Sequence, residues 1–285
     1  MIATQEHGWT QLADRAGLRW PDAAGWAMAQ AAAAGLEAWE PLVQGPGDLR
    51  RVAGLARRHG LAMPSIFMTG PLHDPEGAAA TMGRMRAVLR AAGALGCRLA
   101  SVYPSPEPDG GSKPDAALAV QARNLGALAR ASRAEGVRLL YHPEEGCLAH
   151  GGREAAHMLL ADGDLGLCLD PDAVWRASGE GMAAVLGFLR QWGARVAEVH
   201  LRQCRGGVWT ARRWGRGTWT SGPSPRRSGP RAPGPSWWSS TPSRRARLSR
   251  STRSRRTGGA CGTSRTPSCR ASMPDRADGD SGRRA

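Results

Sequence analysis

Hydrophobic and polar positions follow two patterns along residues 1–202. Short, mostly apolar runs recur about every 30 residues, and amphipathic stretches rich in Ala, Leu and Arg lie between them. Short apolar runs are typical of buried strands, and the amphipathic stretches predict helices. We expect seven strands, at Ile2–Glu6, Leu36–Pro41, Ala62–Met68, Arg98–Tyr103, Val137–His142, Leu165–Asp170 and Val196–Leu201.

A predicted helix separates each of these strands from the next. The helices are expected at residues 21–34, 47–59, 76–95, 114–135, 152–161 and 179–192. Strands connected through helices run parallel, and mostly apolar strands fit a parallel sheet that is buried on both faces. The spacing suits a doubly wound sheet or a (β/α)₈ TIM barrel. We predict an α/β fold of the TIM-barrel type that is incomplete, with about seven βα units.

The composition changes at about residue 210. Residues 1–210 carry 21 Lys and Arg and 21 Asp and Glu, so their charges balance. Residues 211–285 carry 18 Arg and 3 Asp, no Glu, Lys, Val, Ile or Phe, and the single leucine Leu248. A segment with so few aliphatic side chains cannot bury a core. The sequence therefore predicts a barrel domain at 1–210 and a disordered basic tail at 211–285, with no apolar run for an eighth strand.

Several classes of protein are disfavoured. No apolar run reaches the roughly 20 residues that cross a bilayer, so no membrane association is expected. The first residues have neither a basic region nor an apolar region, so no signal peptide is expected. The 6 Cys have no metal or disulfide spacing. Together these features predict a cytoplasmic protein.

Polar side chains collect where the predicted strands end. His142, Asp170 and His200 end the fifth, sixth and seventh strands, so they are expected to be neighbours on the rim of a barrel. Each residue alone has a structural explanation, because a strand-end acid often caps a helix and a buried His is often a hydrogen-bonded core residue. Two imidazoles and a carboxylate that face inward together predict a site for Mn²⁺, Co²⁺, Zn²⁺ or Fe²⁺.

Two segments carry a resemblance to a known family. They are Gly136–Asp172 and Arg195–Thr210, and their most specific parts are Cys168-Leu169-Asp170 and Val199-His200-Leu201. The order and spacing of nearly all of residues 1–210 resemble the xylose-isomerase-like TIM-barrel superfamily of sugar phosphate isomerases and epimerases. That superfamily also contains inosose dehydratases, ketose 3-epimerases and endonuclease IV.

The resemblance implies a divalent metal held by four strand ends. These supply a Glu or His after strand five, an Asp after strand six, a His after strand seven and a Glu after strand eight. The first three positions correspond to His142, Asp170 and His200. The implied reaction is isomerisation or epimerisation of a sugar or polyol, by proton transfer beside a carbonyl that the metal polarises. An inosose-dehydratase-like lyase on the same barrel is the alternative.

The remaining site residues are also expectations from the resemblance. Glu40 and Glu145 are expected to be catalytic, His7 and Arg202 to contact substrate, and Glu6 to face the substrate. The chain departs from its relatives after strand five, because many of them have His-Asn-His where it has His142-Pro143-Glu144. Either Glu144 or Glu145 could therefore replace His142 as the ligand.

The tail has two interpretations. An Arg-, Pro-, Ser-, Gly- and Trp-rich segment is what a G/C-rich gene encodes out of frame. With G/C-rich codons from Arg212 on, reading two nucleotides later yields A-L-G-P-G-D-V-D, the kind of loop expected before strand eight. A frameshift near residues 210–212 would remove strand eight, so we expect impaired activity. The alternative is an arm that binds nucleic acid non-specifically, using runs such as Arg253–Arg256 and Trp237-Trp238.

The nucleotide sequence downstream of codon 210 distinguishes the two interpretations. A frameshift predicts an intact reading frame in the shifted phase that encodes a helix and then a strand bearing a Glu. Stop codons throughout that phase would contradict the frameshift and favour a genuine basic arm.

Overall fold

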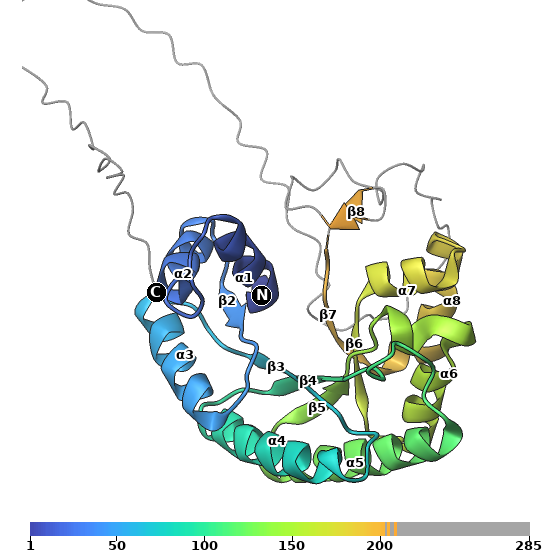
Figure 1. The fold of residues 1–285 in the computed structure, drawn as a ribbon. Coiled ribbons are helices and arrows are strands. Elements are labelled where there is room, and N and C mark those ends of the chain that lie inside the picture. The colour runs from blue at the N-terminus through green and yellow to red at the C-terminus, as the bar shows by residue number, and fades with distance from the viewer. Residues whose placement is uncertain (203, 206–207, 210–285) are drawn as a thin grey trace, which may run out of the picture. The chain divides into compact units, whose positions relative to one another are not determined.

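Seven parallel strands form the centre of the described chain (Figure 1). The computed structural model describes residues 1–202, 204–205 and 208–209; the predicted tail and the predicted boundary at 210 lie outside them. Every predicted strand is confirmed, with bounds that differ from the predicted ones by at most three residues. The strands are β1 Ala3–Gln5, β2 Ala38–Glu40, β3 Ser65–Gly70, β4 Leu99–Pro104, β5 Arg138–Tyr141, β6 Gly166–Leu169 and β7 Val196–Val199.

The order of the strands in space is their order in the chain. β1 pairs with β2, and β3 to β7 form a continuous parallel sheet. Two parallel bridges, Ala38 of β2 with Ala62 and Leu42 with Phe67 of β3, connect the segment of β2 to the segment of β3. A doubly wound sheet would reverse its strand order at a switch point. Unbroken sequential order instead identifies an incomplete TIM barrel.

Helices connect successive strands and confirm the six that were predicted. They are α2 Ala24–Ala33, α3 Pro46–Arg58, α4 Gly77–Ala94, α5 Asp115–Ala134, α6 Glu145–Ala161 and α8 Met182–Trp192. α6 begins seven residues before its predicted start and is interrupted at Ala149–Gly152, where His150, Gly151 and Gly152 have positive φ. Its second part is the helix that was predicted.

Two further helices, α1 Glu6–Arg15 and α7 Pro171–Ser178, were not predicted. α7 has strong local signals. Its N-cap Asp170 accepts hydrogen bonds from the backbone N–H groups of Asp172 and Ala173, Pro171 stands at the first helical position, and Gly179 ends it with φ 70°. Asp170 is therefore both a helix cap and a side chain on the strand-end rim.

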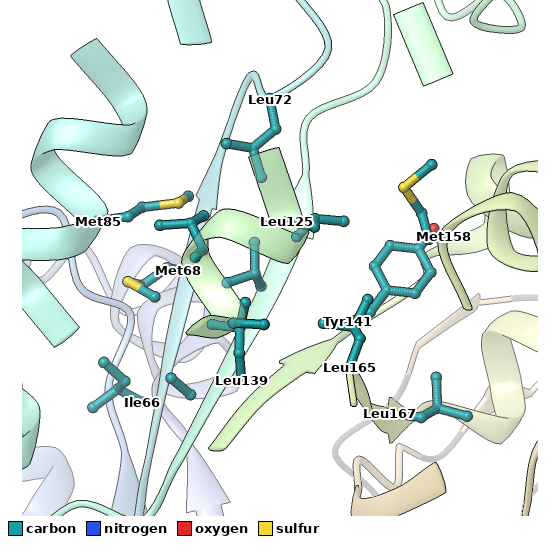
Figure 2. Close-up of a cluster of buried hydrophobic side chains, with 14 of the residues drawn as sticks. Ile66, Met68, Leu72, Met85, Leu125, Leu139, Tyr141, Met158, Leu165 and Leu167 are labelled. Atoms are coloured by element: carbon teal, nitrogen blue, oxygen red, sulfur yellow. The ribbon is translucent and has the colours of Figure 1, made fainter. Parts of the chain in front are cut away.

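The outer face of the sheet packs on the helices. Alternate residues of β3 to β6, among them Ile66 and Met68 of β3, Leu139 and Tyr141 of β5 and Leu167 of β6, pack with residues of α4 to α8 in one apolar cluster (Figure 2). The residues between them, such as Phe67, Leu140 and Cys168, are also buried but lie outside this cluster. Since successive side chains of a strand point to opposite faces, these residues line the inner face.

Contacts across the inner face show that the sheet is curved. Ser101 of β4 donates a hydrogen bond of 3.0 Å to Glu198 of β7, and the Gln5 amide of β1 lies 3.4 Å from the ring of His200, which follows β7. These strands are not neighbours in the sheet, so their side chains meet only because the sheet rolls round on itself. The inner face is therefore the interior of an incomplete barrel.

The described chain continues after β7 as an antiparallel hairpin. Cys204–Arg205 (β8) pairs with Val208–Trp209 (β9), so neither strand extends the parallel sheet. Within the described residues, no helix has the length and hydrophobicity needed to cross a membrane.

Candidate metal and active site

Acidic and imidazole side chains gather at the carboxyl ends of the strands, as predicted. Glu40, His142 and Asp170 are buried, and His200 is largely buried. The two imidazole rings lie 4.8 Å apart, and the ring of Phe67 packs against both, at 5.1 Å from His142 and 5.9 Å from His200. The site thus combines titratable groups with an apolar wall.

The backbone fixes the positions of the two histidines. The N–H of His142 donates to the carbonyl of Val102 on β4, and the N–H of His200 donates to the carbonyl of Leu169 on β6, at 2.9 and 2.8 Å. Both bonds continue the parallel ladder one residue beyond the strand. The ring positions therefore depend on the sheet itself, which is more rigid than a loop.

Three groups of residues with possible ligand atoms occur among the described residues. Within each group, the ligand atoms lie within 4.8 Å of one another. The groups are His142, Cys168 and His200; Glu40, Glu198 and His200; and His142, Glu144 and Asp170. The predicted metal triad His142, Asp170 and His200 is divided between these groups. His142 and His200 share one group, and His142 and Asp170 share another.

A buried ion pair links the second and seventh strands. His200 Nε2 lies 2.9 Å from Glu40 Oε2. Burial alone would raise the pKa of Glu40, but the nearby His200 lowers it, so Glu40 is ionised at neutral pH. Glu198 lies within the same group, and burial together with the charge of Glu40 raises its pKa. The two carboxyls thus differ in their tendency to hold a proton.

Arg202 lies among the acids at the rim. Its Nε is 3.0 Å from Asp170 and 3.0 Å from Asp172, and its terminal Nη2 is 3.3 Å from Glu144. Burial would raise the pKa of Glu144, but His142 and Arg202 lower it to about 2. Burial raises the pKa of Asp170 despite the opposing effect of Arg202. Arg202, which was predicted to contact substrate, is therefore also the counterion of this acidic cluster.

The structure does not bring His7 and Glu145 into the buried cluster. His7 is exposed on α1 and its ring contacts Gln11, at 2.9 Å. Glu145 begins α6, half exposed, and forms an ion pair of 2.7 Å with Arg176.

Glu6, next to His7, was expected to face the substrate, but the structure buries it. Its carboxylate accepts hydrogen bonds from the indole N–H groups of Trp20 and Trp39, at 2.9 and 3.4 Å. The Glu6 side chain therefore anchors two tryptophans, and Trp39 packs with residues of α2 and α3 in a second apolar cluster.

Sequence reasoning missed two residues of the cluster, Cys168 and Glu198. Each stands two positions before a predicted ligand on the same strand, and Cys168 is the register partner of Glu198 across β6 and β7. The period of two along a strand puts them on the same face as Asp170 and His200. The alternation along the two predicted strands was therefore enough to indicate both residues.

A model of the family described as xylose isomerase-like TIM barrel matches residues 28–220. The chain belongs to this family. No curated protein sequence matches it.

Three solved structures illustrate the likeness. A sugar phosphate isomerase/epimerase from Parabacteroides distasonis is 12% identical, with a TM-score of 0.54 over 73% of this chain and 77% of that one. D-allulose 3-epimerase from Methylomonas sp. is 19% identical, with a TM-score of 0.52 over 67% and 71%. A xylose isomerase-like TIM-barrel protein from Mycobacterium smegmatis, in complex with magnesium, is 13% identical, with a TM-score of 0.52 over 65% and 70%. At these identities the likeness concerns the fold.

The side chains present at the strand ends fit a divalent cation. Among the described residues, Glu40 Oε1 and His142 Nδ1 are buried atoms without a hydrogen-bond partner. Buried polar atoms are normally satisfied, so unsatisfied ligand atoms at the strand ends indicate a missing partner. Imidazole, carboxylate and thiol together are the donors that first-row divalent metals prefer.

The Arg202–Glu144 contact makes a prediction for metal-free protein. Replacing Arg202 with Gln should raise the pKa of Glu144 from about 2, although His142 still holds it below 4.5. A lowered carboxyl pKa stabilises the fold above the unfolded value and loses that effect as pH falls through the folded value. The stabilisation should therefore disappear at a higher pH in the variant. NMR titration of the carboxyl groups checks this, with the exposed Arg190→Gln as control. An unchanged pKa of Glu144 in Arg202→Gln would contradict the conclusion that Arg202 lowers it.

Proposed function

We propose that the chain is a divalent-metal-dependent isomerase or epimerase of a sugar or polyol. The observation that carries the proposal is a set of overlapping ligand groups at the carboxyl ends of parallel strands, which share His142 and His200 and include the buried Glu40 and Asp170. In TIM-barrel enzymes the reaction takes place at this end. The epimerases among the structural neighbours support the choice of substrate class.

His142 is the central residue of the proposed metal site, because it belongs both to the group with Glu144 and Asp170 and to the group with Cys168 and His200. A bound divalent cation would polarise a substrate carbonyl and the adjacent hydroxyl, which acidifies the C–H bond between them. The chain's own groups would orient the substrate oxygens, and the ring of Phe67 would exclude water from one side.

Glu40 is the proposed base. Its carboxylate is ionised because of His200, and its Oε1 has no hydrogen-bond partner among the described residues, so it can accept a proton from substrate. Glu198 is the proposed acid that returns a proton, because its raised pKa keeps the carboxyl protonated to higher pH. We favour Glu198 over the predicted Glu145 for this role, since Glu145 is at the rim on Arg176. His7 and Arg202 stay predicted substrate contacts.

Exchange of a C–H hydrogen of the substrate with solvent tests the proposal. Ketoses incubated in D₂O should gain deuterium next to the carbonyl when Mn²⁺, Co²⁺ or Zn²⁺ is present, and NMR should show loss of the exchange on chelation. Glu40→Gln should slow exchange by about 10²–10⁴-fold, the usual contribution of a general base. The exposed Glu37→Gln is the matched control and should leave the rate unchanged.

The same assay tests the effect of the tail. A chain with the shifted frame restored should exchange faster than the present one, because the family's fourth ligand would be present. Equal rates would contradict the predicted impairment. Absence of metal-dependent exchange in both chains, across the common ketoses, would contradict the proposed function.

A further inference from the structure

Cys168 lies at the centre of the imidazole cluster although the proposed reaction does not require it. It is fully buried in β6, on the inner face and below Asp170. One ligand atom each of Cys168, His142 and His200 lies within 4.8 Å of the other two. Cys97 and Cys147 are also buried, but neither belongs to any of the possible ligand groups of the described residues.

The ring of His142 is oriented as metal-binding histidines are. Its Nε2 lies 3.2 Å from Glu144 Oε1, while its Nδ1 is buried and has no hydrogen-bond partner among the described residues. Metal-ligating histidines usually donate the N–H of one ring nitrogen to a carboxylate and bind with the other. His200 also has a carboxylate on one ring nitrogen, that of Glu40 at 2.9 Å.

The group of oxygen donors is less suited to a cation. The carboxylates of Glu144 and Asp170 already form ion pairs with Arg202, at 3.3 and 3.0 Å. A cation bound between them would have to displace the guanidinium. At the group that contains Cys168, a cation would instead displace the neutral Gln5 amide, which lies 3.4 Å from His200 Nδ1, while Glu40 keeps its contact with Nε2. Phe67 shields the two rings of that group from one side.

We propose that Cys168 is a metal ligand, and that its thiolate with His142 and His200 forms a two-nitrogen, one-sulfur site for Zn²⁺. The proposal rests on the proposed function in that it names the cation and the ligands of the same site. Three protein ligands with an open fourth position are typical of catalytic zinc. A thiolate ligand favours zinc over hard cations such as Mg²⁺, which prefer oxygen. On binding, the thiol releases its proton to solvent.

Cobalt spectroscopy of the full chain tests the ligand. Co²⁺ bound by a thiolate shows a sulfur-to-cobalt charge-transfer band in the near ultraviolet, which we expect in the present chain. Cys168→Ser should abolish the band and weaken Zn²⁺ binding by at least the roughly 10–100-fold that loss of an outer-shell partner costs. Cys97→Ser is the matched control, a buried cysteine that precedes β4 at the opposite end of the strands. It should leave the band and the affinity unchanged.

The outcomes separate this proposal from the proposed function. Cobalt that binds without the band, or a band that persists in folded Cys168→Ser, would overturn thiolate ligation and leave a metal-dependent enzyme intact. Absence of Co²⁺ and Zn²⁺ binding would overturn both. If Cys168→Ser does not fold, X-ray absorption of the zinc-loaded present chain decides. Zn–S scattering at about 2.3 Å is expected, and a shell of nitrogen and oxygen alone would overturn the proposal.

Discussion

The buried carboxylate of Glu40 imposes the main constraint on this structure. It lies on the inner face of the second strand with 2% of the residue exposed, where an unpaired charge would be very costly. Its partner is His200, which follows the seventh strand. The contact is possible only when the sheet curves far enough for β7 to face β2. The site can therefore assemble only in a curved sheet.

The two faces of the strands have different roles: the outer face stabilises the fold, and the inner face carries the polar groups of the site. The outer residues, such as Ile66, Leu139 and Leu167, pack in the apolar cluster under the helices and supply the hydrophobic stabilisation. The inner residues carry hydroxyl, thiol, carboxyl and imidazole groups that interact across the interior. A polar interior of this kind is stable only if its members satisfy one another, so the ligand atoms left without partners are informative.

The positions of all seven strands were predictable because short apolar runs and parallel connections leave little freedom. Convergence of His142, Asp170 and His200 on one rim followed from the same topology. The division of these residues among separate ligand groups did not, since it depends on side-chain directions such as the contact of Arg202 with Asp170. α1 and α7 were missed because the residues that start them were interpreted as strand ends.

Side-chain contacts between distant buried segments could not be predicted from the sequence. Glu6 was expected near substrate, but the indoles of Trp20 and Trp39 hold it, and only the folded chain brings these three together. Cys168 and Glu198 were within reach, because the alternation of side chains on β6 and β7 puts them below predicted ligands.

A double-mutant cycle on Glu40 and His200 tests the central claim most directly. Glu40→Gln and His200→Gln should each lower the free energy of unfolding at pH 7 by roughly 3–5 kcal/mol, because each leaves a buried partner uncompensated. The double variant should lose less than the sum, with a coupling energy of about 1–3 kcal/mol. Additive losses, with coupling near zero, would show that β2 and β7 do not meet through this pair and would contradict the account.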